Sequence, residues 1–183
     1  EAAAVRGESL EVERRAVGAE HTHTLISASN WAFTLKAQGK YEEAAALQRE
    51  TLDARRRVLG AEHPKTLDSA GGLASTLEEL GQYEESAALH RETLHVRRRV
   101  LGAEHPQTLV SVGNFAHTLQ AQGQHEEAAA LRRETLDVQR RALGAEHPHT
   151  LISASNLAFT LKAQGQYEEA AALQRETLDA RRR

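Results

Sequence analysis

The tetrapeptide Gly-Ala-Glu-His occurs four times, beginning at Gly18, Gly60, Gly102 and Gly144, so that successive copies lie 42 residues apart. A constant period of about 20–50 residues is typical of solenoids, in which each unit covers the apolar face of its neighbour and none is stable alone. The repetition extends through the unit, because residues 23–57 and 149–183 differ only at Trp31/Leu157 and Lys40/Gln166. The period therefore predicts an array of repeats.

One unit, residues 60–101, shows what each repeat is expected to form. Pro64 suits the first position of a helix, where its missing N–H has no partner to lose. Apolar residues then recur three and four positions apart, which is the stripe of an amphipathic helix. Gly81 ends this helix, since glycine takes the left-handed cap conformation at little cost, and a second helix follows from Tyr83. Each unit is thus predicted to hold two antiparallel helices of roughly 16 and 19 residues.

The same spacing predicts one all-α array of nine helices over residues 1–183. A lone helix of the second type occupies residues 1–17, and it is followed by repeats over 18–59, 60–101, 102–143 and 144–183, the last of them truncated.

Several positions of the unit resemble the tetratricopeptide repeat: Asn30-Trp31-Ala32, Leu35, Gln38-Gly39, Tyr41, Glu43-Ala44 and Leu47. The 42-residue period and the Leu-Gly-x-x-His-Pro sequence between units resemble the kinesin-light-chain and nephrocystin branch of that family. The resemblance implies a right-handed superhelical solenoid of antiparallel helix pairs. The chain departs from the family at Thr51, Thr93, Thr135 and Thr177, where alanine is usual, and at Gly72, which replaces an asparagine of the inner face.

Composition excludes several classes of function. The chain has no cysteine, which rules out disulfides and thiolate zinc sites. Its net charge of −3 gives no general attraction to nucleic acid or to an anionic membrane. No apolar run reaches the roughly 18 residues of a transmembrane helix. We therefore expect neither nucleic acid nor membrane as a partner and no cofactor. The sequence leaves the compartment open, with a cytoplasmic location favoured.

The polar residues do not predict an enzyme. A catalytic site needs an asymmetric set of nucleophile, base and orienting group, whereas here nearly every polar residue recurs in equivalent places. His21, Ser29 and Asp53 can be named as a set, but nothing in their spacing brings them together.

The histidine pairs allow two interpretations. His21 with His23, and His147 with His149, each beside a glutamate (Glu20, Glu146), have the spacing at which two imidazoles in a turn could share a divalent ion. His63 and His105 recur at the same place without a second histidine, and no third ligand is evident. We therefore expect the repeated histidine to cap or pack the loop.

The arginine triplets 55–57, 97–99 and 181–183 resemble patches that bind phosphate. Acidic residues on these second-type helices lie four positions before an arginine, however, which is the spacing of ion pairs within a helix: Asp53 before Arg57, Asp137 before Arg141 and Asp179 before Arg183. Aromatic residues that could stack on bases are missing from this face. We expect a solvated, self-neutralising surface.

Apolar residues outside the core stripe are the strongest sign of function. Ile26 and Phe33 lie seven residues apart, beside Asn30 and Lys36, and away from the stripe that includes Leu25 and Leu35. The family resemblance implies that this row faces a concave groove that binds peptides, and an asparagine amide can pair with both polar groups of a peptide backbone. The predicted groove residues are Ile26, Asn30, Phe33, Lys36, Asp68, Val110, Asn114, His117, Ile152, Asn156, Phe159 and Lys162. Alternatively, the longer second helices cover Ile26 and Phe33.

These observations predict a non-catalytic scaffold that binds a peptide or protein segment in its groove. One alternative is a structural spacer or self-associating module, and another is the sensor arm of a larger nucleotide-binding switch protein. Self-association is expected to involve the terminal helices, where apolar residues have no following repeat to cover them: Ala2, Val5, Val12, Ala171 and Leu178.

Overall fold

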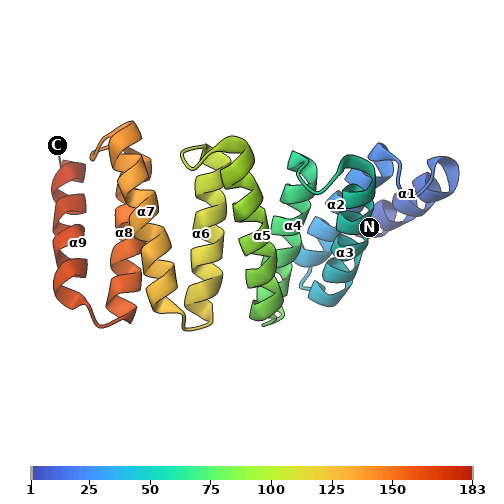
Figure 1. The fold of residues 1–183 in the computed structure, drawn as a ribbon. Helices are drawn as coiled ribbons and strands as arrows, with labels where there is room; N and C mark the ends of the chain where they lie inside the picture. The colour runs from blue at the N-terminus through green and yellow to red at the C-terminus, as the bar shows by residue number, and fades with distance from the viewer. Residues whose placement is uncertain (1, 183) are drawn as a thin grey trace. The chain divides into compact units, whose positions relative to one another are not determined.

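The computed structural model describes the backbone of residues 2–182 and the side chains of residues 7–180 and 182. In this part of the chain the secondary structure consists of nine α-helices joined by short turns (Figure 1). The predicted all-α class and the predicted number of helices are therefore confirmed for the described residues. The chain divides into two compact units, residues 1–93 and 94–183, and the division lies within helix α5 (Tyr83–Leu101).

The first unit is a succession of helices in which each packs on the next. Contacts join α1 to α2, α2 to α3 and α3 to α4 (Figure 1). The bounds are α1 Ala2–Val17, α2 Thr22–Ala37, α3 Tyr41–Leu59 and α4 Pro64–Glu79, followed by the first part of α5. The 16 residues of α2 and the 19 of α3 are the predicted lengths of the two helix types.

The second unit repeats this arrangement after the last part of α5. Contacts join α6 to α7, α7 to α8 and α8 to α9. The bounds are α6 Pro106–Ala121, α7 His125–Leu143, α8 Pro148–Ala163 and α9 Tyr167–Arg182.

The repeated histidine caps the first helix of each pair. The Nδ1 atom of His63 accepts a hydrogen bond from the backbone N–H of Lys65 at 3.1 Å, and that of His105 accepts from Gln107 at 3.2 Å. His21 and His147 make the same contact with His23 and His149, both at 3.3 Å. An N-cap acceptor satisfies one of the N–H groups that a helix start leaves without a partner. The prediction that this histidine caps the loop is confirmed.

Glycine makes the sharp turn between the helices of a pair. Gly81 has a φ of 71°, a conformation that other residues rarely adopt, and it follows the last turn of α4. The N–H of Gln82 then reaches back to the carbonyl of Leu77 at 2.8 Å, which is the six-residue closure of a Schellman turn. This turn reverses the chain within three residues, so α5 starts beside α4.

The core is built from leucine and alanine. In the first unit Leu52, Leu73 and Leu77 form a buried cluster with Ala45 and Ala70. In the second unit Leu136, Leu157 and Leu161 form the equivalent cluster with four alanines (Ala129, Ala154, Ala158, Ala170). Because alanine adds almost no bulk at a contact, the helices can approach closely, and it also has the highest helix propensity.

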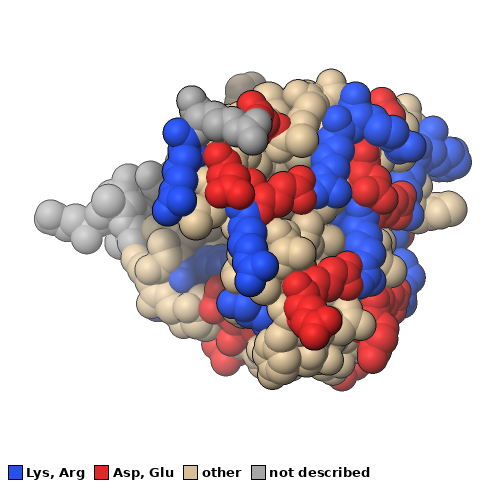
Figure 2. Space-filling model, turned by 90° about the vertical axis from the view of Figure 1, so that its left-hand side faces the viewer, with Lys and Arg blue, Asp and Glu red and all other residues tan. Residues whose placement is uncertain are grey.

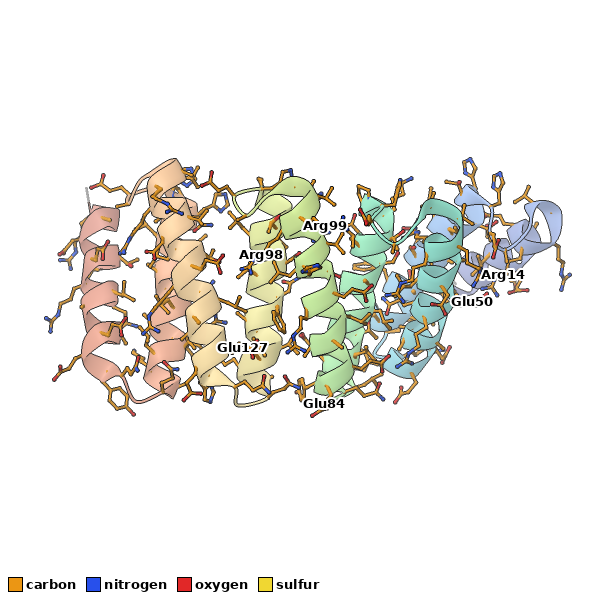
Figure 3. All side chains as sticks on the ribbon, in the orientation of Figure 1. Arg14, Glu50, Glu84, Arg98, Arg99 and Glu127 are labelled. Atoms are coloured by element: carbon orange, nitrogen blue, oxygen red, sulfur yellow. The ribbon has the colours of Figure 1, made fainter. Side chains whose placement is uncertain are left out.

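Ion pairs connect equivalent helices of neighbouring repeats, 36 residues apart in sequence. In the first unit Arg14 pairs with Glu50 at 2.8 Å, and both side chains are labelled in Figure 3. Arg49 and Arg56 pair with Glu85 and Glu92. The second unit contains the pairs Arg98–Glu134, Arg133–Glu169 and Arg140–Glu176, at 2.7, 3.0 and 2.7 Å.

These pairs correct the ion pairs predicted within single helices. Arg57 does not pair with Asp53, because its Nε lies 2.8 Å from Glu20, which belongs to the turn before α2 in the same repeat. Asp53 lies instead 4.0 Å from Arg56, one turn away. Arg183 lies outside the described residues. The packing of α3 brings an acid from the turn before α2 closer to Arg57 than the acid on its own helix.

Two arginines of the triplets are part of the interior, which contradicts the prediction of a fully solvated surface. Arg55 and Arg97 are each only 7% exposed. Arg55 donates hydrogen bonds to the carbonyls of Lys65 and Leu25, both at 3.2 Å, and to the Ser69 hydroxyl. Burial lowers the pKa of Arg55, while the nearby Asp68 acts in the opposite direction. Its guanidinium is buried because backbone carbonyls replace its water shell.

The remaining charges are mixed. On the face shown in Figure 2, basic and acidic side chains are interspersed. None of the helices in the described part of the chain could cross a lipid bilayer.

Candidate functional site

The predicted groove residues of the first unit lie mainly on α2, and its two large apolar side chains face solvent. Phe33 is 71% exposed and Ile26 is 39% exposed, whereas the neighbouring Leu25 and Ala32 are buried. Asn30, between them on the same face, is also exposed, as is Asp68 on α4. The alternative prediction, that the second helices cover Ile26 and Phe33, is wrong.

Lys36 joins the rows of α2 and α4. Its Nζ atom donates to the Ser75 hydroxyl at 2.7 Å and to the Ser75 carbonyl at 3.1 Å, and it lies 3.9 Å from Glu79. Lys36 is therefore half-buried, and its ammonium group binds to the next repeat. Because its ammonium group is held by Ser75 and Glu79 of α4, it is less available to a ligand than the sequence predicted.

In the second unit the predicted row runs along α6 and α8. Val110, Ile152 and Phe159 are 59%, 51% and 63% exposed, while Phe115 on α6 is buried at 3%. The polar members are exposed as well, namely Asn114, His117, Asn156 and Lys162. Two phenylalanines of the same unit thus have opposite environments, as the helical stripe requires.

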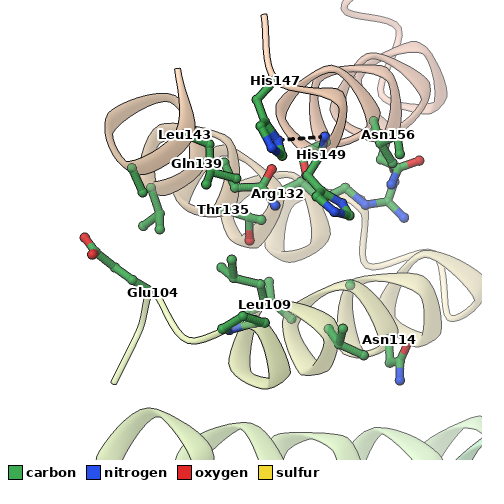
Figure 4. Close-up of a pocket in the computed structure, with 18 residues that line it drawn as sticks. Glu104, Leu109, Asn114, Arg132, Thr135, Gln139, Leu143, His147, His149 and Asn156 are labelled. Carbon is green, nitrogen blue, oxygen red and sulfur yellow. Dashed lines mark hydrogen bonds between the residues drawn. The ribbon is translucent and has the colours of Figure 1, made fainter. Parts of the chain in front are cut away.

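A cavity of about 540 Å³ lies between α6, α7 and α8 (Figure 4). Four of the predicted groove residues line it together: Val110, Asn114, Ile152 and Asn156. The structure does not place His117, Phe159 and Lys162 in its wall. Leu109, Val112 and Val138 give the cavity an apolar surface, and the polar groups of Glu104, Gln139 and Ser153 also line it.

Arg132 forms one end of this cavity. Its NH1 atom donates to Gln120 Oε1 at 2.8 Å, to the Asn156 carbonyl at 2.9 Å and to the Thr160 hydroxyl, so that it ties α7 to both neighbouring helices. Burial lowers the pKa of Arg132 from its ordinary value. An arginine nevertheless stays charged at neutral pH, and these contacts fix its guanidinium at the end near Asn156.

His147 and His149 lie at the other end, where α8 begins. Their rings stack with centroids 5.4 Å apart, and the cap contact of His147 is the dashed line in Figure 4. Because Nδ1 of His147 is occupied as a cap acceptor, this nitrogen is not free to bind an ion. The pair therefore serves first to start the helix.

Sequence reasoning missed the α7 side of the cavity, which includes Arg132, Thr135 and Gln139. A signal was present at Gln139, since the equivalent residues are Glu13, Arg55, Arg97 and Arg181, so that glutamine replaces the most frequent arginine. Arg132 gave no such signal, because its position varies among the repeats, with Arg6, Gln48, His90 and Gln174 as the equivalents. A residue that differs from its equivalents shows that the local contacts change, but it does not show that a cavity forms there.

Comparisons with known proteins agree with this architecture. The family model described as "Tetratricopeptide repeat" matches residues 23–99, 71–131 and 111–183. A kinesin-light-chain-like protein from Podosopora anserina, whose crystal structure has nearly identical TPR-like repeats, has a TM-score of 0.93 at 29% identity, covering 98% of this chain and 85% of that one. A single-substitution variant of that protein gives 0.92 at 28% identity, covering 98% and 84%.

A more distant structure shares the fold alone. BtubC (BKLC) from P. vanneervenii has a TM-score of 0.82 at 16% identity, covering 97% of this chain and 71% of that one. No curated protein sequence is significantly similar to this chain. With the repeat model matching nearly the whole length and the helix pairs arranged as that model requires, the chain belongs to the tetratricopeptide-repeat family.

Proposed function

We propose that this chain binds an extended or helical segment of a partner protein along an exposed row of first-type helices, which is formed by α2 and α4 in the first unit and by α6 and α8 in the second. Tetratricopeptide arrays are protein–protein interaction modules, and this chain is one of them. The further step, to a groove with named residues, rests on one observation. Phe33 and Phe159 are 71% and 63% exposed on α2 and α8, two helices whose leucines are all buried.

Exposed aromatic rings of this kind point to an interface. A ring left in water forgoes the ~1.5–3 kcal/mol that its full burial would contribute, and grouped apolar exposure on a soluble surface commonly marks a contact site. In each unit an asparagine lies on the same face as the ring, Asn30 beside Phe33 and Asn156 beside Phe159. An asparagine amide carries both donors and an acceptor, which suits a peptide backbone. No asymmetric catalytic set is needed for this role.

The test uses peptides selected from a random library on the intact chain. Their affinity is then measured for Phe159→Ala and for Val100→Ala, which shortens a 51% exposed apolar side chain on α5, away from the row. We expect the first variant to bind at least about tenfold more weakly, as for a central aromatic contact, and the second to bind like the parent. Selected peptides that bind Phe159→Ala and the parent equally would contradict the groove.

Self-association is a second candidate because the outermost described helices expose apolar side chains. Val12 of α1 is 65% exposed and Leu178 of α9 is 49% exposed, while Ala171 is half-buried. The side chains of Ala2 and Val5 lie outside the described residues. Contacts that cover these side chains would remove apolar area from water at roughly 25 cal/mol per Å².

A further inference from the structure

Positions 13, 55, 97 and 139 are equivalent at the 42-residue period, and each is followed 14 residues later by a serine on the next helix. The first three form a hydrogen bond with that serine, and the fourth does not. The hydroxyl of Ser27 donates to Glu13 Oε1 at 2.9 Å. At the equivalent place, 42 residues on, Arg55 donates to the Ser69 hydroxyl. Another 42 residues on, Arg97 donates to the Ser111 hydroxyl at 2.8 Å and to the Gln107 carbonyl at 3.3 Å.

Gln139 takes this position in the fourth case, where no hydrogen bond joins its Oε1 atom to the equivalent serine. The residue is only 8% exposed, yet its Oε1 atom accepts no hydrogen bond from any described residue. A buried acceptor without a partner costs free energy unless something else donates to it. Gln139 and the equivalent serine, Ser153, both line the cavity between α6, α7 and α8 (Figure 4).

The wall of the cavity includes the residues whose counterparts bind a guanidinium elsewhere in the chain. Arg55 donates to the carbonyls of Lys65 and Leu25. Lys65 corresponds to His149 and Leu25 to Leu109 at the 42-residue period, and both of these line the cavity. A planar guanidinium has five N–H donors, which suits a group of converging acceptors.

The charge at the cavity is also suitable for a cation. Glu104 lines it and forms no ion pair with any described residue, although the equivalent Glu20 pairs with Arg57 at 2.8 Å. Arg132 lines the same cavity, and its positive charge would repel a bound cation. It lies two helical turns from Gln139 on α7, roughly 10 Å along the axis, and its guanidinium is held at the Asn156 end.

We propose that this cavity receives an arginine side chain of the bound partner segment, with its guanidinium donating to Gln139 Oε1, the Ser153 hydroxyl and the His149 carbonyl. The ligand arginine takes the place that Arg55 and Arg97 of the chain itself take in the preceding repeats. The methylene groups of the arginine lie against Leu109, Val112 and Val138. The proposal rests on the proposed function, because Val110, Asn114, Ile152 and Asn156 belong to both the groove and the cavity.

The first experiment probes the cavity without a peptide. Ethylguanidinium is titrated into the intact chain and followed by NMR, with propylurea as the uncharged control of similar shape. We expect saturable shifts at the backbone amides of His149 and Ser153 and at the Gln139 side chain with the first probe, and weak shifts with the second. Shifts spread over the surface, or equal responses to both probes, would overturn the proposal.

The second experiment compares selected peptides that contain arginine with copies in which that arginine is norleucine. On the parent chain we expect the arginine copy to bind at least about tenfold more tightly, as for charge-assisted hydrogen bonds. Gln139→Leu removes the acceptor and leaves an apolar side chain that is one atom shorter, and Gln139→Arg fills the cavity from within. Both variants should abolish the difference. Equal binding of both peptides to the parent would show an apolar pocket and contradict the proposal.

A gain-of-function variant provides the matched control. Arg97→Gln makes the preceding repeat like that of Gln139, and it should create a second ethylguanidinium site reported by the Ser111 amide. The two proposals can also fail separately. If Phe159→Ala has no effect on affinity while Gln139→Leu abolishes the arginine preference, the groove is wrong and the cavity site stands. If ethylguanidinium binds but arginine peptides show no preference, a partner arginine is not the occupant.

Discussion

Two phenylalanines of the second unit offer the most direct test of which face of the helices is free. Phe115 on α6 is 3% exposed and Phe159 on α8 is 63% exposed. Phe115→Ala empties a packed site, for which the expected loss of stability is about 3–5 kcal/mol. Phe159 has only about a third of its surface buried, so its truncation removes about a third of ~1.5–3 kcal/mol, or ~0.5–1 kcal/mol.

Urea denaturation followed by circular dichroism measures both changes. With a slope of about 2 kcal/mol per molar urea, Phe115→Ala should lower the midpoint by roughly 1.5–2.5 M and Phe159→Ala by no more than about 0.5 M. Phe33→Ala repeats the test in the first unit, where the ring is 71% exposed, and should resemble Phe159→Ala. If Phe159→Ala shifts the midpoint as far as Phe115→Ala, the ring is part of the core and the groove reasoning fails.

Three further changes test local features. Gly71→Ala should raise stability by about 1 kcal/mol, because Gly71 lies inside α4 and an added Cβ meets no atom within 4 Å; an unchanged or lower urea midpoint would contradict this. His63→Ala should lower the free energy of unfolding by about 0.5–2 kcal/mol because it removes the N-cap acceptor, while His63→Asn keeps an acceptor and should lower it less. If thermal melts show equal losses of stability for the two variants, the cap contributes little. Light scattering over a dilution series should detect association of the parent chain that Val12→Ser and Leu178→Ser together weaken, and a strict monomer at high concentration would exclude it.

Much of the site could be predicted from the sequence and part of it could not. The exposure of Phe33 and Phe159 follows from helical periodicity, because a residue seven positions from another lies on the same face and either joins or avoids the core stripe. The role of Lys36 could not be predicted in this way, since its partner Ser75 is 39 residues away and belongs to the next repeat. Periodicity places a residue on a face but does not identify its neighbour.

The sequence by itself determined the local structure of this protein. The 42-residue period, the histidine before each first helix and the glycine in each turn are short-range signals, so they fix the helix pairs without reference to distant contacts. Only the tertiary structure decided which charges meet and where a cavity remains. Arg57 pairs with Glu20 rather than Asp53, Arg55 is buried among carbonyls, and Gln139 leaves its acceptor unpaired. Each depends on how closely segments far apart in sequence approach one another, and that distance is set by packing rather than by spacing along the chain.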